Sequence, residues 1–123
     1  MLVDDDKFLL DMYSVKFSQA GFAVHPCFST SEALGTLRTG VKPAAVLFDI
    51  TMPGEDGFAL LETIHKEKLA DGAKLIALTN QGSEADKKKA EEIGVDKYVI
   101  KATMIPSEVV NMVNEALGRP AAK

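Results

Sequence analysis

Hydrophobic positions along the chain fall into two alternating kinds of segment. Short runs of apolar or β-branched residues are followed, five times over, by longer stretches in which apolar residues recur at helical spacing. Strands that alternate with helices in this way build βαβ units and a parallel sheet. The pattern therefore predicts an α/β fold with five strands and five helices.

The residues of each predicted strand indicate its place in the sheet. The runs at 44–48 and 74–78 are apolar almost throughout, as expected of central strands that helices cover on both faces. The strand predicted over 22–28 contains Pro26, which cannot donate to a central ladder, and the strand predicted over 97–100 begins with charged residues. Both suit an edge. With right-handed crossovers, the order 2-1-3-4-5 satisfies these constraints and gives a flavodoxin-like, doubly wound sheet.

Local signals mark the ends of the helices. Gly21 follows the helical stretch 8–20, at a position where a helix C-cap favours a residue that tolerates positive φ. Ser29 to Ser31 before Glu32 offer N-cap and capping-box chemistry for a short second helix that ends near Thr39. The other helices are predicted over 57–69, 83–93 and 106–117.

Size and composition are those of one ordinary domain over residues 1–123, with a short tail at 119–123. The formal charge of −4 argues against nucleic-acid binding, and the lysine run 87–89 is more typical of the solvated side of a helix. Cys27 is the only cysteine, and no apolar run is long enough to cross a bilayer. We therefore expect a cytoplasmic protein with no membrane role. The first strand, 1–3, is short against a mean of five to six residues, which suggests that the numbering begins inside a strand.

Acidic residues stand where two neighbouring strands end. Asp4, Asp5 and Asp6 follow the first strand, and Asp49 follows the third. Adjacent strands lie about 4.8 Å apart, so these carboxylates would repel one another unless a hard divalent cation with oxygen ligands joined them. Magnesium fits best, because a few carboxylates, waters and a phosphate oxygen satisfy it. The alternative for any single residue is a solvated loop carboxylate.

Two further groups end strands at the same rim. Thr79 ends the fourth strand and Lys101 the fifth. With Asp49 as nucleophile, Lys101 as a cationic clamp and Thr79 as a hydroxyl donor, the set can neutralise a phosphoryl group during transfer. The alternative for Thr79 is a cap or turn hydroxyl. Tyr98 lies on the fifth strand just before Lys101, and the alternative to a role at the site is a half-buried edge-strand aromatic.

Four segments hold these residues: Val3-Asp4-Asp5-Asp6, the stretch Phe48-Asp49-Ile50-Thr51-Met52-Pro53-Gly54-Glu55-Asp56-Gly57, Leu78-Thr79, and Tyr98-Val99-Ile100-Lys101. In their order and separations they resemble the signatures of response-regulator receiver domains. The resemblance covers the whole chain. It implies that Asp5 ligates Mg²⁺ directly and that Asp4 helps to hold it, in part through water. Asp49 would be both ligand and phosphoacceptor, and the backbone carbonyl of Thr51 would complete the coordination.

The resemblance also implies a mechanism and partners. Thr79 would move toward the phosphoryl oxygen, Tyr98 would swing inward behind it, and Lys101 would pair with the acyl phosphate. The chain would be a switch of a two-component phosphorelay that receives its phosphoryl group from a sensor histidine kinase or phosphotransfer protein. The face formed by the fourth helix, fifth strand and fifth helix would control a downstream protein. The only catalysis expected is self-catalysed phosphoryl transfer and autodephosphorylation, in a monomer or weak homodimer.

Two departures from the family pattern and three rival functions remain open. Lys101 precedes Ala102 where relatives usually have proline, and cis peptides cost about 2.5–4 kcal/mol without proline, so this loop is expected to be trans. Asn80 follows Thr79 where many relatives have a small residue. The chief rival is a receiver-like binding module that is not phosphorylated. A phosphohydrolase would want an acid at position 51, and a flavodoxin-like redox carrier would want a phosphate loop after the first strand.

Overall fold

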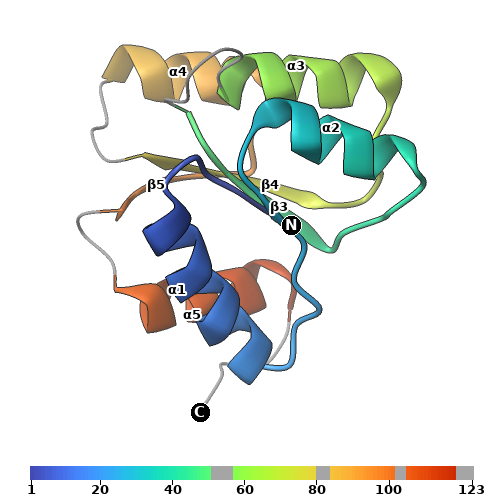
Figure 1. Ribbon diagram of the computed structural model, residues 1–123. Coiled ribbons are helices and arrows are strands. Elements are labelled where there is room, and N and C mark those ends of the chain that lie inside the picture. Colours follow the sequence, from blue (N-terminus) through green and yellow to red (C-terminus); the bar gives the residue numbers. More distant parts are fainter. Residues whose placement is uncertain (51–56, 80–83, 102–104, 119–123) are drawn as a thin grey trace.

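The computed structural model describes residues 1–50, 57–79, 84–101 and 105–118, and shows one parallel sheet between two helical layers (Figure 1). The order of its strands is β2-β1-β3-β4-β5, with every pair parallel, so the predicted topology is confirmed. The strands are β1 (Leu2–Val3), β2 (Pro26–Cys27), β3 (Ala45–Asp49), β4 (Lys74–Thr79) and β5 (Lys97–Ile100).

Helices follow each strand and cover both faces of the sheet. In Figure 1, α2, α3 and α4 lie on one face, and α1 and α5 lie on the other. Their bounds are α1 (Lys7–Gln19), α2 (Thr30–Arg38), α3 (Gly57–Glu67), α4 (Glu84–Ile93) and α5 (Pro106–Ala116). Each helix lies within a few residues of its predicted position. In the described ranges, no helix has both the length and the apolar character that a bilayer span requires.

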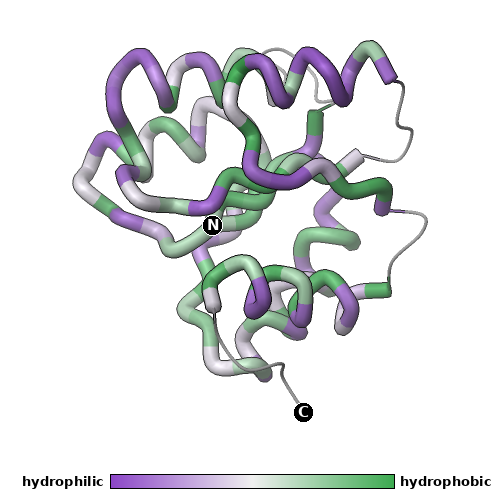
Figure 2. Tube along the Cα trace, turned by 180° about the vertical axis from the view of Figure 1, so that it is seen from behind, coloured by the Kyte–Doolittle hydropathy of each residue, from purple (hydrophilic) through white to green (hydrophobic). Residues whose placement is uncertain are grey.

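The hydrophobic core consists of two layers that the sheet separates. Along β3, Val46 and Phe48 belong to the layer beneath α2 and α3, whereas Ala45 and Leu47 belong to the layer beneath α1 and α5. A central strand that feeds two cores must be apolar at successive positions, which explains why this segment shows no alternation. Figure 2 shows the result as a hydrophobic band along the strands, with hydrophilic residues outside.

Helix ends follow the capping signals of the sequence. Gly21 has φ 93° directly after α1, and the Ser29 side chain accepts a hydrogen bond from the backbone N–H of Glu32 at 3.1 Å. The Glu32 carboxylate accepts from the backbone N–H of Phe28, the residue before the cap, and not from that of Ser29 as a capping box would require. The predicted end of α3 at residue 69 is wrong by two residues, because Lys68 adopts φ 55° and terminates the helix. Ser83 lies outside the described residues.

The second strand is shorter than predicted. Only Pro26 and Cys27 pair with β1, whereas the sequence indicated a strand over 22–28. A strand needs a neighbour to pair with, and among the described residues β1 offers one only from Leu2 onward. At the other end, the backbone N–H of Phe28 is engaged by the capping carboxylate of Glu32.

Helix α4 packs more lightly than the other helices. Of its ten residues only Ala90 is buried. The ammonium group of Lys89 lies 4.5 Å from the centroid of the Phe58 ring on α3, in a cation–π contact. Ile93, at the end of the helix, is partly buried against the same core layer.

Candidate functional site

The predicted site residues meet at the carboxyl ends of the strands. Asp4 follows β1, Asp49 ends β3, Thr79 ends β4 and Lys101 follows β5. All four are buried, with exposed fractions of 4%, 6%, 3% and 7% in that order. Asp4 and Asp49 lie where the winding of the sheet reverses between β1 and β3, which is where doubly wound sheets bind ligands.

The parallel register brings these residues together. Val3 lies opposite Phe48, and Asp49 lies opposite Leu78, so the residues that follow or end β1, β3 and β4 reach the same edge. Ile100 lies opposite Thr79, which places Lys101 one residue further along the rim. The proximity of Asp4, Asp49, Thr79 and Lys101 is thus a consequence of strand order and strand length.

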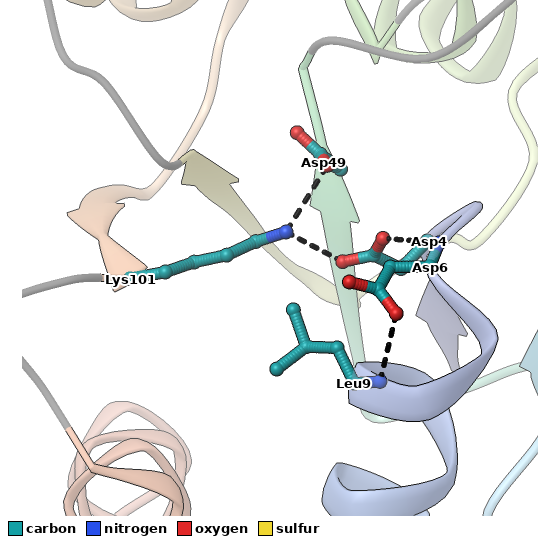
Figure 3. Close-up of polar contacts among 5 residues, drawn as sticks. All are labelled: Asp4, Asp6, Leu9, Asp49 and Lys101. Atoms are coloured by element: carbon teal, nitrogen blue, oxygen red, sulfur yellow. Dashed lines mark hydrogen bonds and ion pairs between the residues drawn. The ribbon is translucent and has the colours of Figure 1, made fainter.

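Lys101 links two of the carboxylates across the site. Its Nζ donates to Oδ2 of Asp4 at 2.6 Å and to Oδ2 of Asp49 at 3.0 Å (Figure 3). Burial favours the neutral amine, but the hydrogen bond and charge of Asp4, with those of Asp49, outweigh it, and the pKa of Lys101 is raised above its usual value. The side chain is therefore a buried, charged ammonium group.

The acidic groups have the donor set of a hard-cation site. Asp4, Asp5 and Asp49 each offer a carboxylate oxygen, and these oxygens lie within 4.8 Å of one another. Asp5 is exposed, whereas the other two are buried. Three carboxylates and the ammonium of Lys101 leave a formal charge of −2, which a divalent cation balances. Oxygen ligands, this spacing and this charge fit Mg²⁺.

Asp6 has a different role from its neighbours. Its Oδ1 accepts a hydrogen bond from the backbone N–H of Leu9 at 3.1 Å, so Asp6 is the N-cap of α1 (Figure 3). Its own backbone N–H donates to Oδ1 of Asp4 at 2.9 Å. In the sequence Asp6 stands beside the other acids, but an aspartate just before a helical stretch is also an N-cap signal. The cap orients Asp4 through the intervening turn.

Tyr98 lies on the α4 side of β5, half-buried against the core layer beneath α2 and α3. Its hydroxyl is buried and has no hydrogen-bond partner among the described residues. Burial, followed by the negative charges of Asp86 and Glu84, raises the pKa of this phenol. Within the part of the chain that the structure describes, this hydroxyl lacks the partner that buried polar groups usually have.

Two further residues, Tyr13 and Gly57, lie close to the site. Tyr13 on α1 is buried; burial raises the pKa of its phenol, and the charges of Lys101 and Asp4 also act on it. The position of Tyr13 in the helical pattern of the sequence did not indicate that the charges of Lys101 and Asp4 act on it. Gly57 donates its backbone N–H to Ile50 at 2.9 Å, and a Cβ there would clash with the Asp49 carbonyl and lie 2.8 Å from the Ile50 Cα. Glycine is thus required by close packing against the end of β3.

Several predicted features lie outside the described residues. These are the carbonyl of Thr51, the loop residues Met52 and Pro53, Asn80, and the peptide that joins Lys101 to Ala102. They stay predictions.

Comparison with known proteins agrees with this arrangement. The sequence profile of the family described as "Response regulator receiver domain" matches residues 1–114. Over 119 residues, or 97% of the chain, the sequence is 33% identical to "Regulatory protein VanRc" of Enterococcus gallinarum and 29% identical to "Phosphate regulon transcriptional regulatory protein PhoB" of Pseudomonas aeruginosa. These matches cover 49% and 51% of the two relatives, so the chain spans about half their length.

A solved structure shows the same fold. The CheY-like receiver domain from Methanospirillum hungatei JF-1 superposes with a TM-score of 0.86 at 28% identity, over 95% of this chain and 90% of that one. The agreement extends over nearly all of the sheet and its helices.

Proposed function

Because the chain belongs to the response-regulator receiver domain family, whose members act in phosphorylation-dependent signalling, we propose that Asp49 is its phosphoacceptor and that Mg²⁺ is its cofactor. The observation that carries the proposal is the buried Lys101 ammonium, which bridges Asp4 and Asp49 in a pocket of net negative charge. The donor would be a phosphohistidine on a sensor kinase or phosphotransfer protein. The chain would catalyse only its own phosphorylation and dephosphorylation, in the cytoplasm, as a monomer or weak homodimer.

Each residue of the site has a separate task in this mechanism. A carboxylate oxygen of Asp49 attacks phosphorus in line, and the histidine nitrogen leaves on the opposite side. Lys101 then has an oxygen of the new phosphoryl group within reach and offsets its charge. Thr79 ends the adjacent strand and supplies a hydroxyl from that side. Mg²⁺ held by Asp4, Asp5, Asp49 and the Thr51 carbonyl would neutralise charge on the phosphoryl oxygens.

Phosphorylation would be read out on the face formed by α4, β5 and α5. The new charge draws Thr79 toward the phosphoryl group, and Tyr98 turns inward into the space that this opens. Two observations support this: among the described residues the Tyr98 hydroxyl has no hydrogen-bond partner, and only one residue of α4 is fully buried. A downstream protein would bind one arrangement of this face more tightly than the other.

Exposed apolar side chains near the site support a protein as the donor. Phe8, Met12 and Val15 on α1 are exposed to 82%, 36% and 53%. Their spacing of four and three residues puts them on one side of the helix, and the stripe begins two residues after the Asp6 cap. A protein that presents a phosphohistidine to Asp49 would cover this stripe, whereas a small phosphodonor would not.

The proposal is tested by mass spectrometry after incubation with acetyl phosphate and Mg²⁺. We expect the chain to gain the mass of one phosphoryl group, and to lose it on mild alkaline treatment, as acyl phosphates do. Asp49→Asn should show no gain. Asp71→Asn is the matched control, because Asp71 is exposed in the loop before β4 and its substitution removes the same charge at a position away from the site.

Two results would contradict the assignment. Equal labelling of Asp49→Asn would place the phosphoryl group on another residue. No labelling of the unmodified chain, together with no stabilisation by millimolar Mg²⁺, would favour the rival function as a binding module that is not phosphorylated.

A further inference from the structure

Alternation of side chains along the strands places the charged part of the site on one side of the sheet. Asp4 comes two residues after Leu2, and Asp49 comes two residues after Leu47. Leu2 and Leu47 belong to the core layer beneath α1 and α5. Side chains two residues apart on a strand project from the same side, so both carboxylates are directed toward that layer. The Lys101 ammonium group, which binds both, lies with them.

Tyr13 of α1 belongs to the same layer. It is 3% exposed and, among the described residues, is the only buried member of this hydrophobic cluster with a polar side-chain group. Helix α1 begins at the rim with its Asp6 cap, and side chains on a helix lean toward its N-terminus, so the phenol is directed toward the site. Burial raises the pKa of this phenol, and the charges of Lys101 and Asp4 reach it.

Lys101 and Tyr13 both have unused hydrogen-bonding capacity. An ammonium group has three N–H donors, and two of those of Lys101 bind Asp4 and Asp49. Among the described residues, neither the third donor nor the Tyr13 hydroxyl has a hydrogen-bond partner. Buried polar groups normally have one, and phenylalanine would fill the same space without burying a hydroxyl. A donor and an acceptor that both need partners therefore lie on the same side of the sheet.

We propose that Tyr13 is a positioning residue of the site, whose hydroxyl oxygen accepts the third N–H of Lys101 through one water or after a small rotation of the phenol. Two contacts leave the ammonium group free to turn about the line that joins the two carboxylates. A third contact from α1 removes that freedom and holds the group where it meets the phosphoryl oxygen. The proposal rests on the role of Lys101 in the proposed function.

Urea unfolding without metal tests the link as a double-mutant cycle of Tyr13→Phe and Lys101→Met. In the unmodified chain, Tyr13→Phe should lower the midpoint by about 0.7 M, the shift expected for the loss of one hydrogen bond. In Lys101→Met, the same substitution should shift the midpoint by less than about 0.3 M, the margin within which independent substitutions add. The reason is that the ammonium group is then absent.

Tyr98→Phe is the matched control for this cycle. It removes the same hydroxyl from a phenol in the layer beneath α2 and α3, where Asp86 and Glu84, and not Lys101, are the charges that act on it. Its effect on the midpoint should therefore be the same with Lys101 as with methionine at that position.

Phosphorylation by acetyl phosphate and Mg²⁺ tests the positioning role itself. Tyr13→Phe should slow the labelling of Asp49 about fivefold, the factor that one hydrogen bond supplies. Adding Tyr13→Phe to Lys101→Met should slow labelling no further, because the hydroxyl acts only through the ammonium group.

Two outcomes would overturn the proposal. Equal midpoint shifts for Tyr13→Phe in the two backgrounds would mean that the hydroxyl stabilises the fold without Lys101. An unchanged labelling rate in Tyr13→Phe would mean that it does not position the ammonium group. If the unmodified chain takes up no phosphoryl group, the proposed function fails, while the unfolding cycle still decides whether Tyr13 and Lys101 are linked.

Discussion

Replacing Lys101 with methionine removes the buried charge that offsets two carboxylates. Methionine keeps most of the length and apolar volume of the side chain, so the change is mainly electrostatic. Asp4 and Asp49 would lose their contacts with Nζ at 2.6 and 3.0 Å and would face each other in a pocket without a counter-ion. We expect Lys101→Met to destabilise the fold in the absence of metal.

The size of the effect follows from burial. Removing one partner of a buried ion pair costs about 3–5 kcal/mol, mostly because the remaining charge is desolvated without compensation. The site lies at the rim, where water reaches the exposed Asp5, so the lower end applies and we expect about 3 kcal/mol. With a urea m-value of about 1.5 kcal/mol/M, the midpoint of unfolding would fall by about 2 M.

Urea unfolding with and without Mg²⁺ measures this, with Lys97→Met as the matched control. Lys97 is exposed at the start of β5, so its replacement should change stability by less than about 0.5 kcal/mol. Three carboxylates without Lys101 form a more negative site. Mg²⁺ should therefore stabilise Lys101→Met more than it stabilises the unmodified chain. A variant as stable as the unmodified chain, or one that Mg²⁺ does not rescue, would refute the electrostatic argument.

Two further predictions test the packing around the site. Gly57→Ala should lower the free energy of unfolding by about 1–3 kcal/mol in chemical denaturation, because the added Cβ would meet the backbone of β3. Gly35→Ala, on the open face of α2, is the control and should raise it by about 0.5–1 kcal/mol. Equal effects of the two substitutions would contradict the close approach at Gly57. Absorbance at 295 nm reports only Tyr13 and Tyr98, since the chain has two tyrosines and no tryptophan. Burial raises the pKa of both phenols, so both should ionise above pH 10. The stability that the neutral phenols contribute is fully present below the pKa of the unfolded state, and it is lost as the pH rises through the pKa of the folded state. Tyr98→Phe should remove one of the two steps, and a step at the unperturbed value would show that the phenol is not buried.

The sequence was sufficient for the topology because the strands carry separate signals. The apolar runs at 44–48 and 74–78 could only be central, and Pro26 could only lie at an edge. The length of β2 was not predictable, because it depends on where β1 begins. The end of α3 depended on Lys68 at φ 55°, a conformation that its residue type does not signal.

The site was predictable as far as parallel register dictates it. Residues that end adjacent parallel strands must meet at one rim, and this gave the proximity of Asp4, Asp49, Thr79 and Lys101. Details that depend on side-chain conformation were not predictable. Coordinates are needed for the contact of Lys101 with both carboxylates, for the N-cap role of Asp6 and for the surroundings of the Tyr98 hydroxyl.

If α4 moves as proposed, its anchoring would set the energy scale of that rearrangement. Burying a methyl group contributes roughly 0.8 kcal/mol and a cation–π contact at an exposed site about 0.5–1 kcal/mol, so Ala90 and Lys89 add little to the contact that the partly buried Ile93 makes with the core. Inverting a two-state population from 1:99 to 99:1 takes about 5.5 kcal/mol. On the proposed mechanism, a few charge-assisted hydrogen bonds at the rim would be enough to change the preferred position of such a helix, and one covalently attached anion would supply interactions of that size.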